Sequence, residues 1–314
     1  MLARLLLVLS VSISYAFANE PEYSAVQWLE KMSQAMKNLN YQGTVAIVKN
    51  GRLDSMKYFH QAKNGQEKER LLSLNSPIRD VIRDSGKVSC FLEDSQTIIV
   101  NHRPSSKSFI LNLPASFSTL SDAYNISLGK EELVATHPVR VISIEAKDNF
   151  RYGRKIWVDK QHFLPLKMEI YDLSGVAVEQ VIFTDIKIGL PAVLINAETE
   201  FKNIKVKHIH QSDFFPIEQS DIILENLPEG FKVAFFTRMN IGKSEQSVDH
   251  LLLSDGFSSI SVYKEIKTNH VPKGFQVLGV INSFTHLIKN YQITVMGEVP
   301  AQTVQFVAQG IRFH

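Results

Sequence analysis

Apolar and polar residues alternate with a period of two over long stretches of this chain. In residues 164–171, Leu166, Met168 and Ile170 alternate with polar side chains, so a strand here has one dry face and one wet face. Similar runs, separated by turn residues, occupy 44–49, 52–61, 139–146, 152–158 and 176–186. The pattern predicts a large antiparallel sheet.

Two other stretches have the helical period. Before the first strand, one helix face collects positions 26, 29, 32, 33, 36 and 39, which are apolar except for Ser33. Near the C-terminus, a strand at 293–297 is closed by Gly297 and Pro300, and Val304, Val307, Ala308 and Ile311 then share one helix face. Each apolar stripe must cover something, so both helices are expected to pack on sheets.

Short turn signals connect the strands. Asn50-Gly51, Asn64-Gly65, Asp84-Ser85-Gly86 and Ser254-Asp255-Gly256 all place a glycine where a hairpin needs a positive φ. The expected fold class is therefore α+β. It comprises a large curved antiparallel β-sheet, a half-barrel with covering helices, and a smaller C-terminal α/β domain.

A curved sheet with one or two covering helices has a concave apolar face, where an acyl chain or an apolar peptide could lie. The candidate lipid-binding residues on this sheet are Trp157, Met168, Ile170 and Phe183. The alternative is that helices and side chains fill the concavity, since protein interiors are close-packed. The sequence leaves both interpretations open.

The N-terminus has the features of a signal peptide. Arg4 precedes the apolar run 5–9, and Ala16-Phe17-Ala18 is a small-x-small site. We therefore expect a signal peptide at 1–18, cleaved after Ala18, then a large domain at 19–188, a linker at 189–220 and a small domain at 221–314. Within the linker, period-two apolar positions in 201–210 offer an alternative, one more strand at a sheet edge.

Composition and motifs narrow the function. The 34 basic and 32 acidic residues are scattered, which does not indicate a nucleic-acid binder, and the single Cys90 excludes an intrachain disulfide. Neither a zinc, a serine-hydrolase nor a nucleotide-binding motif is present. His208 and His210, with Asp213 nearby, resemble a partial metal site without a third ligand, and a solvated segment explains them better. We expect no catalytic residues, no metal and no cofactor.

Two C-terminal blocks carry a family resemblance. Residues 250–263 read HLLLSDGFSSISVY, and residues 293–303 read ITVMGEVPAQT. Both resemble the small C-terminal domain of the MucB/RseB family of sigma-E factor regulatory proteins. Stretches at 77–83, 151–152 with 157–159, 164–168 and 178–180 resemble the family's large domain in the same order.

The resemblance implies a periplasmic negative regulator whose large domain is similar to lipoprotein carriers. Such a protein binds the periplasmic segment of a membrane-spanning anti-sigma factor and shields it from the site-one protease. The envelope-stress response then stays off until lipopolysaccharide or another lipid releases the regulator. Neither the sequence nor the resemblance decides whether the protein forms a homo-oligomer. The rival classes are a periplasmic lipid or lipoprotein carrier and, less favoured, an enzyme with a metal at His208 and His210.

An unstructured partner segment can pair with an exposed strand edge, and the hairpin of the small domain offers one. The candidate partner-binding residues there are Phe257, Ile260, Val262, Tyr263 and the polar neighbour Glu298, together with Arg238 and Lys243 in an expected loop. The alternative for Ile260 and Val262, favoured by the alternation, is that they form the core beneath the last helix.

Overall fold

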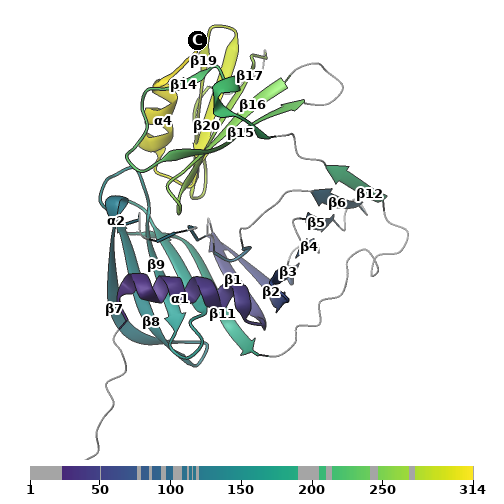
Figure 1. Cartoon of the computed structure of the whole chain (residues 1–314), viewed down its shortest axis with the longest axis vertical. Helices are drawn as coiled ribbons and strands as arrows, with labels where there is room; N and C mark the ends of the chain where they lie inside the picture. Colours follow the sequence, from purple (N-terminus) through teal and green to yellow (C-terminus); the bar gives the residue numbers. More distant parts are fainter. Residues whose placement is uncertain are drawn as a thin grey trace, which may run out of the picture.

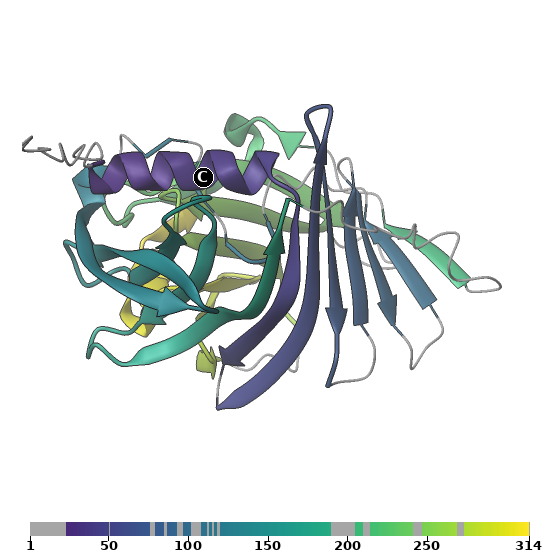
Figure 2. The same cartoon turned by 90° about the horizontal axis from the view of Figure 1, so that it is seen from below.

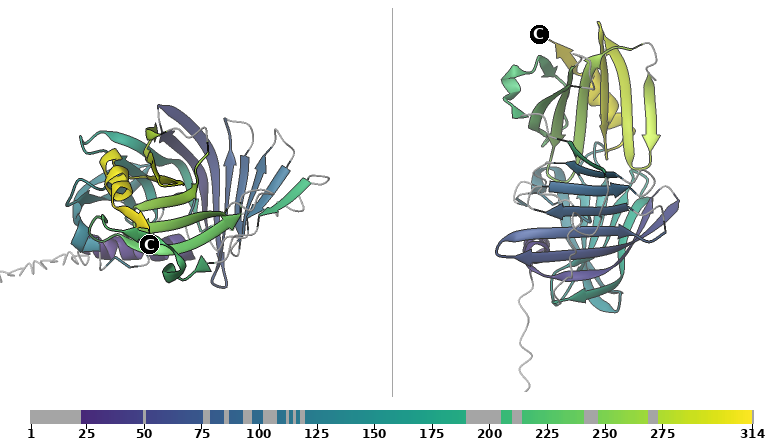
Figure 3. Two further views of the ribbon diagram at one scale, coloured as in Figure 1. Left: turned by 90° about the horizontal axis from the view of Figure 1, so that it is seen from above. Right: turned by 90° about the vertical axis from the view of Figure 1, so that its right-hand side faces the viewer.

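The computed structural model describes residues 23–49, 51–75, 79–84, 87–92, 97–101, 108–111, 113, 114, 116, 117, 120–189, 205–209, 214–240, 247–268 and 273–313. The chain forms a twelve-stranded sheet, a seven-stranded sheet and a two-stranded sheet. The seven-stranded sheet stacks on one end of the large curved sheet, as Figures 1 and 3 show. No helix in the described part of the chain has the length and apolar character needed to cross a membrane.

The large sheet consists of two consecutive meanders joined side by side. The first runs through β1 (Tyr41–Lys49), β2 (Arg52–Lys63), β3 (Gln66–Ser73), β4 (Arg79–Asp84), β5 (Lys87–Leu92) and β6 (Thr97–Asn101). The second runs through β7 (Tyr124–Val134), β8 (His137–Ala146), β9 (Gly153–Asp159), β10 (Pro165–Tyr171) and β11 (Ala177–Ile188). The antiparallel pairing of β1 with β11, which sets Val45 opposite Phe183, joins the two.

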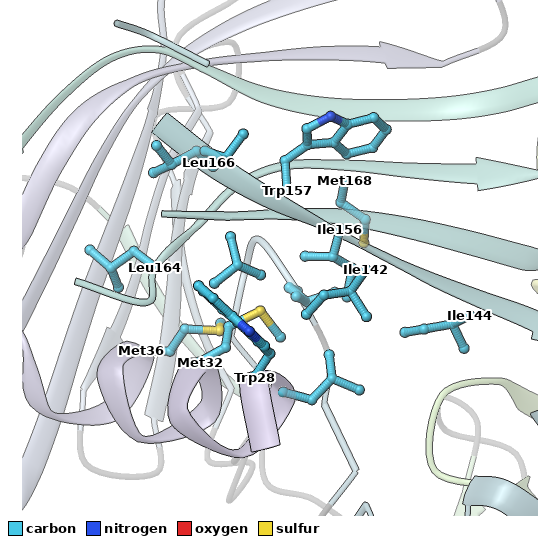
Figure 4. Packing of buried hydrophobic residues seen from close by; sticks show 14 of the residues in the cluster. Trp28, Met32, Met36, Ile142, Ile144, Ile156, Trp157, Leu164, Leu166 and Met168 are labelled. Carbon is cyan, nitrogen blue, oxygen red and sulfur yellow. The ribbon is translucent and has the colours of Figure 1, made fainter. Parts of the chain in front are cut away.

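Helix α1 (Ala25–Asn38) covers the concave side of this sheet (Figure 2). Ser24 begins it with a capping box, in which the Ser24 hydroxyl accepts from the Gln27 backbone N–H and the Gln27 side chain accepts from the Ser24 N–H. Its buried stripe of Trp28, Leu29, Met32 and Met36 packs towards the apolar residues of β8, β9 and β10 (Figure 4). The expected N-terminal helix and its function as a cover are confirmed.

The concave face is filled in the described part of the chain. Leu111, Phe117 and Leu120, the last of these in the short helix α2 (Leu120–Ala123), are buried in the same core as α1. Where Ile110 and Leu111 meet Leu166, Val181 and Phe183 of β10 and β11, the side chains leave no room for a water molecule. Of the two interpretations of the concavity, the filled one describes this region.

Strands β3 and β4 of the first meander carry buried charges on both faces. Glu69 and Arg83 are register partners and form an ion pair with Nε and Oε2 3.1 Å apart. On the opposite face, Arg70 donates from Nε to Asp80 Oδ1 at 3.0 Å and also from Nη2 to Oδ2. Buried charges are stable only when paired in this way.

The seven-stranded sheet of the small domain is covered by helix α4 (Ala301–Gln309). Its strands, in spatial order, are β13 (Phe214–Phe215), β15 (Lys232–Asn240), β16 (Ser247–Ser254), β17 (Ser259–Ile266), β20 (Tyr291–Gly297), β19 (Ile281–Ile288) and β18 (Gly274–Leu278). The expected C-terminal helix ends earlier than its stripe: Ile311 is buried in the same core but lies in β21 (Ile311–Phe313), which pairs with β14 (Ile222–Leu224).

The segment expected to be a linker contains regular structure. Strand β12 (Lys205–Ile209) pairs in parallel with β6 and adds a strand to the edge of the large sheet, as the alternative interpretation of 201–210 holds. Strand β13 and the 3₁₀ turn η1 (Ile217–Gln219) then lead into the small domain. His210 and Asp213 lie outside the described residues, and so does the signal-peptide segment 1–18.

Candidate binding site at the domain interface

The two domains meet where the β8–β9 connection of the large domain contacts the β16–β17 hairpin turn. Gly256 at this turn has a φ of +104°, and a Cβ there would lie 2.8 Å from the Pro114 Cβ. Glycine is therefore required twice, for its conformation and for the close approach. The turn signal at 254–256 is confirmed, and it also marks where the domains touch.

A buried arginine holds this contact together. Arg151 is 1% exposed and donates from Nε to Asp255 Oδ2 at 2.6 Å, from Nη1 to Asp148, and from Nη2 to the Glu229 carbonyl. Tyr124 donates its hydroxyl to the same Asp255 carboxylate at 2.8 Å. Burial, reinforced by the negative charge of Asp255, raises the pKa of Tyr124, so the phenol keeps its proton and remains a donor.

Further contacts extend the interface on both sides of Arg151. The Tyr152 hydroxyl accepts from Asn282 Nδ2 at 3.0 Å, and Thr303 in α4 donates to the Phe150 carbonyl at 3.0 Å. The Phe150 and Phe306 rings lie 4.9 Å apart between centroids. The interface therefore has a polar centre with apolar contacts around it.

A cavity of about 150 Å³ lies at this interface. Its walls come from both domains: Arg154, Met168, Ile170 and Glu179 from the large domain, with the segment 108–111, and Phe257 and Glu298 from the small domain. Two candidate lipid residues, Met168 and Ile170, thus lie in one cavity with two candidate partner residues, Phe257 and Glu298. Its lining is more polar than apolar and includes charged groups of both signs.

The other two candidate lipid residues lie elsewhere. Phe183 is 2% exposed and packs against Tyr41 and Tyr58 in the core. Trp157 lies on the side of the strands turned away from α1 (Figure 4), where its Nε1 donates to Glu132 at 2.8 Å and Lys167 Nζ sits 4.1 Å from the ring centroid. Trp157 and Met168 therefore lie on opposite faces of the sheet, and the structure does not bring the four candidate residues together.

The remaining candidate partner residues also lie apart from one another. Ile260 and Val262 are fully buried in the core under α4, because β17 lies between β16 and β20, so an exposed edge at this strand is ruled out. Tyr263 stacks on His250 at a centroid distance of 4.4 Å. Arg238 lies in β15, not in a loop, and its Nε is 2.6 Å from Asp249 Oδ1. Lys243 lies outside the described residues.

The residues at the centre of the interface carry no functional signal in the sequence. Arg151 belongs to a family-like stretch, and Asp255 carries only a turn signal. Asp255 does serve its own turn, since its Oδ1 accepts from the backbone N–H groups of Phe257 and Ser258. Its second oxygen binds the other domain, which a local turn signal cannot reveal. In the described part of the chain, no group of three His, Cys, Asp or Glu side chains is placed to hold a metal.

Comparison with known proteins assigns both parts of the chain. The MucB/RseB N-terminal domain matches residues 24–209, and the MucB/RseB C-terminal domain matches residues 217–312. The sigma-E factor regulatory protein RseB of Haemophilus influenzae is 26% identical over 315 residues, covering 98% of this chain and 96% of the relative. The sigma factor AlgU regulatory protein MucB of Pseudomonas aeruginosa is 26% identical over 308 residues, covering 92% and 90%.

Solved structures agree with this assignment. The crystal structure of MucB in complex with MucA(peri) superposes with a TM-score of 0.71 at 25% identity, covering 92% of this chain and 99% of that chain. The relatives found are named for regulation of sigma factors and not for catalysis. With both domains matched in order along nearly all of the described residues, this chain belongs to the MucB/RseB family.

Proposed function

We propose that this protein is a periplasmic regulator that binds the periplasmic segment of a membrane-spanning anti-sigma factor. By shielding that segment from the site-one protease, it keeps the envelope-stress sigma factor inactive. The observation that carries this proposal is the likeness across both domains to MucB in its complex with MucA(peri). A simple carrier does not need the second domain, whereas a protein that reads one signal and contacts another partner does.

The interface cavity supports the proposal because its mainly polar lining carries charges from two domains beside the apolar side chains of Met168, Ile170 and Phe257. An extended segment bound there would contact both domains at once and would depend on their relative orientation. Lipopolysaccharide or another lipid, as the releasing effector, must then favour the form of the regulator that does not bind the segment, because a ligand shifts an equilibrium only through its differential affinity.

The alternative is a periplasmic lipid or lipoprotein carrier. A carrier needs an enclosed apolar space large enough for an acyl chain, and ligand cavities of that kind span about 300–1,000 Å³. In the described part of the chain, α1 and the segment 108–111 occupy the concave face, and the cavity at the interface measures about 150 Å³. Two larger hollows near the β8–β9 connection, of about 360 and 550 Å³, are open to solvent and not enclosed. This geometry favours the regulator over the carrier.

Export is part of the proposal, with cleavage after Ala18. Intact mass of the protein recovered from the periplasm should correspond to a chain that begins at Asn19. Recovery of the full-length chain in the membrane fraction would contradict cleavage there.

The proposal is tested with the purified protein 19–314 and the periplasmic segment of the anti-sigma factor from the same genome. We expect direct binding by calorimetry and slower cleavage of the segment by the site-one protease. Lipopolysaccharide added to the complex should restore cleavage. If the protein neither binds the segment nor slows its cleavage, and instead retains lipids or lipoproteins from envelope extracts, the carrier alternative replaces the proposal.

A further inference from the structure

We infer that Arg154 is the receptor for one carboxylate of the bound anti-sigma segment, a site that rests on the proposed function. Arg154 lies in β9, lines the interface cavity and is 4% exposed. A guanidinium this deeply buried requires compensation for the water it has lost. The protein itself supplies little of this compensation.

The contacts of Arg154 are weak and uncharged. Nη1 donates to the Ser258 hydroxyl at 3.4 Å, and Nη2 donates to the Phe257 carbonyl at 3.4 Å, both near the limit of a hydrogen bond. The Phe257 ring centroid lies 5.6 Å from Cζ, a cation–π contact. Within the described residues, no carboxylate oxygen comes within 4.0 Å of this guanidinium.

Arg151, three residues earlier, provides the internal comparison. It is equally buried, but it is bound to the carboxylates of Asp148 and Asp255. Because Asp255 also accepts from Tyr124, its carboxylate is already committed to the interface. One buried arginine therefore holds the domains together, while the other presents its charge to a cavity.

The two acidic residues of the cavity share one lysine, Lys49, which does not line the cavity. Glu179 Oε2 lies 2.6 Å from Lys49 Nζ, and Glu298 Oε1 lies 3.9 Å from the same ammonium. The positive charge of Arg154 is then the one without an acidic partner at this site. An incoming carboxylate would complete a charge-assisted, bidentate pair of the kind that a guanidinium favours.

The volume of the cavity limits the kind of ligand that can bring a carboxylate to Arg154. About 150 Å³ holds one group of benzene size, too small for an acyl chain but sufficient for one side chain. Met168, Ile170 and Phe257 would contact its methylene groups while Arg154 binds its end. These dimensions fit an Asp or Glu side chain of a peptide that runs across the domain interface.

The decisive experiment measures how single substitutions in the anti-sigma segment change its affinity for the wild-type protein. Each Asp and Glu of the periplasmic segment is replaced singly by Asn or Gln, and affinity is measured by calorimetry. We expect one position to lose about 10- to 100-fold, since a hydrogen bond to a charged group is strong. This arm needs no variant of the protein. A flat scan, with every replacement below about threefold, would overturn the inference and leave the proposed function standing.

Protein variants then locate the partner of that acidic residue. Arg154→Met should lose the same 10- to 100-fold for the wild-type segment but bind the neutral segment variant as wild-type protein does. Arg154→Lys should recover part of the loss. The matched control is Lys155→Met, which removes the neighbouring charge on the opposite face and should leave affinity unchanged. Equal losses for Arg154→Met with both segments would assign Arg154 to domain structure and refute the site.

Two further outcomes separate this inference from the proposed function. If the segment does not bind the wild-type protein at all, the proposed function itself fails. If Arg154→Met keeps its affinity for the segment but loses lipopolysaccharide binding, the cavity belongs to an anionic lipid headgroup and the peptide site is refuted.

Discussion

The two meanders of the large sheet differ in the kinds of side chain that they bury. In the second meander, Ile142, Ile156 and Met168 face α1 and form an apolar core. In the first meander, Glu69 and Arg83 occupy buried positions on β3 and β4 and depend on each other. Both halves belong to one continuous sheet with a shared apolar core, but the first meander adds the buried ion pairs of β3 and β4 to it.

The two meanders should therefore differ in how well they tolerate single substitutions. Apolar packing is non-directional, so a small loss of volume is accommodated at moderate cost. A buried ion pair is stable only when intact, and removal of one partner leaves the other charge uncompensated. The first meander should therefore be the more sensitive half to single substitutions.

The largest effect is expected from Glu69→Gln. Glu69 Oε1 accepts from the Tyr58 hydroxyl at 2.8 Å, and Oε2 accepts from Arg83 Nε and the Phe109 N–H, both at 3.1 Å. Loss of this charge should lower the free energy of unfolding by about 3–5 kcal/mol, measured by urea denaturation. Glu67→Gln is the control, since its half-buried carboxylate also contacts Arg83 and should cost much less.

A smaller effect is expected from Ile156→Val in the second meander. Ile156 is fully buried beneath α1, and removal of one methylene should cost about 0.5–1.5 kcal/mol. Leu133→Ala, at a position 74% exposed, should change stability little by the same measurement. If Ile156→Val proves as damaging as Glu69→Gln, the proposed difference between the meanders is wrong.

The smallest effect concerns pH and Glu169, a charge on the outer face of the second meander. Burial would raise its pKa, but hydrogen bonds from Lys167, Tyr171 and Gln180 outweigh burial and lower the pKa below 4.5. A carboxyl with a depressed folded pKa adds stability above its unfolded pKa and loses it as pH falls through the folded value.

The stability difference between wild type and Glu169→Gln should therefore shrink as urea midpoints are measured from about pH 6 down to about pH 3. A difference that stays constant over this range would show that Glu169 contributes through packing alone. Either result tests whether the second meander uses its charges at all.

The same contrast explains what could be predicted from the sequence. The strands at 139–146 and 164–171 correspond to β8 and β10 because alternation reports one buried face directly. The polar partners on β3 and β4 carry no such signal, since Glu69 and Arg70 both look like surface residues in an amphipathic strand. Their burial depends on elements that a local pattern does not contain.

The candidate site was predictable only in part. Phe257 and Met168 were selected for different functions, and their meeting in one cavity depends on how the domains stack. Arg154 lies between Gly153 and Lys155 in β9, and an arginine in such a polar stretch reads as an exposed residue. Long-range placement, not residue type, gives it an unpaired buried charge.

The pairing of β1 with β11 has a consequence for how the chain reaches this fold. Each meander can form from neighbouring strands, but the junction between them, with Val45 opposite Phe183, must wait for a long loop to close. Until then, β1 and β11 each present an open edge that can recruit other chains. A chain that emerges N-terminus first therefore spends its most aggregation-prone interval with one half built and the other unfinished, and closure of this junction should limit the folding rate.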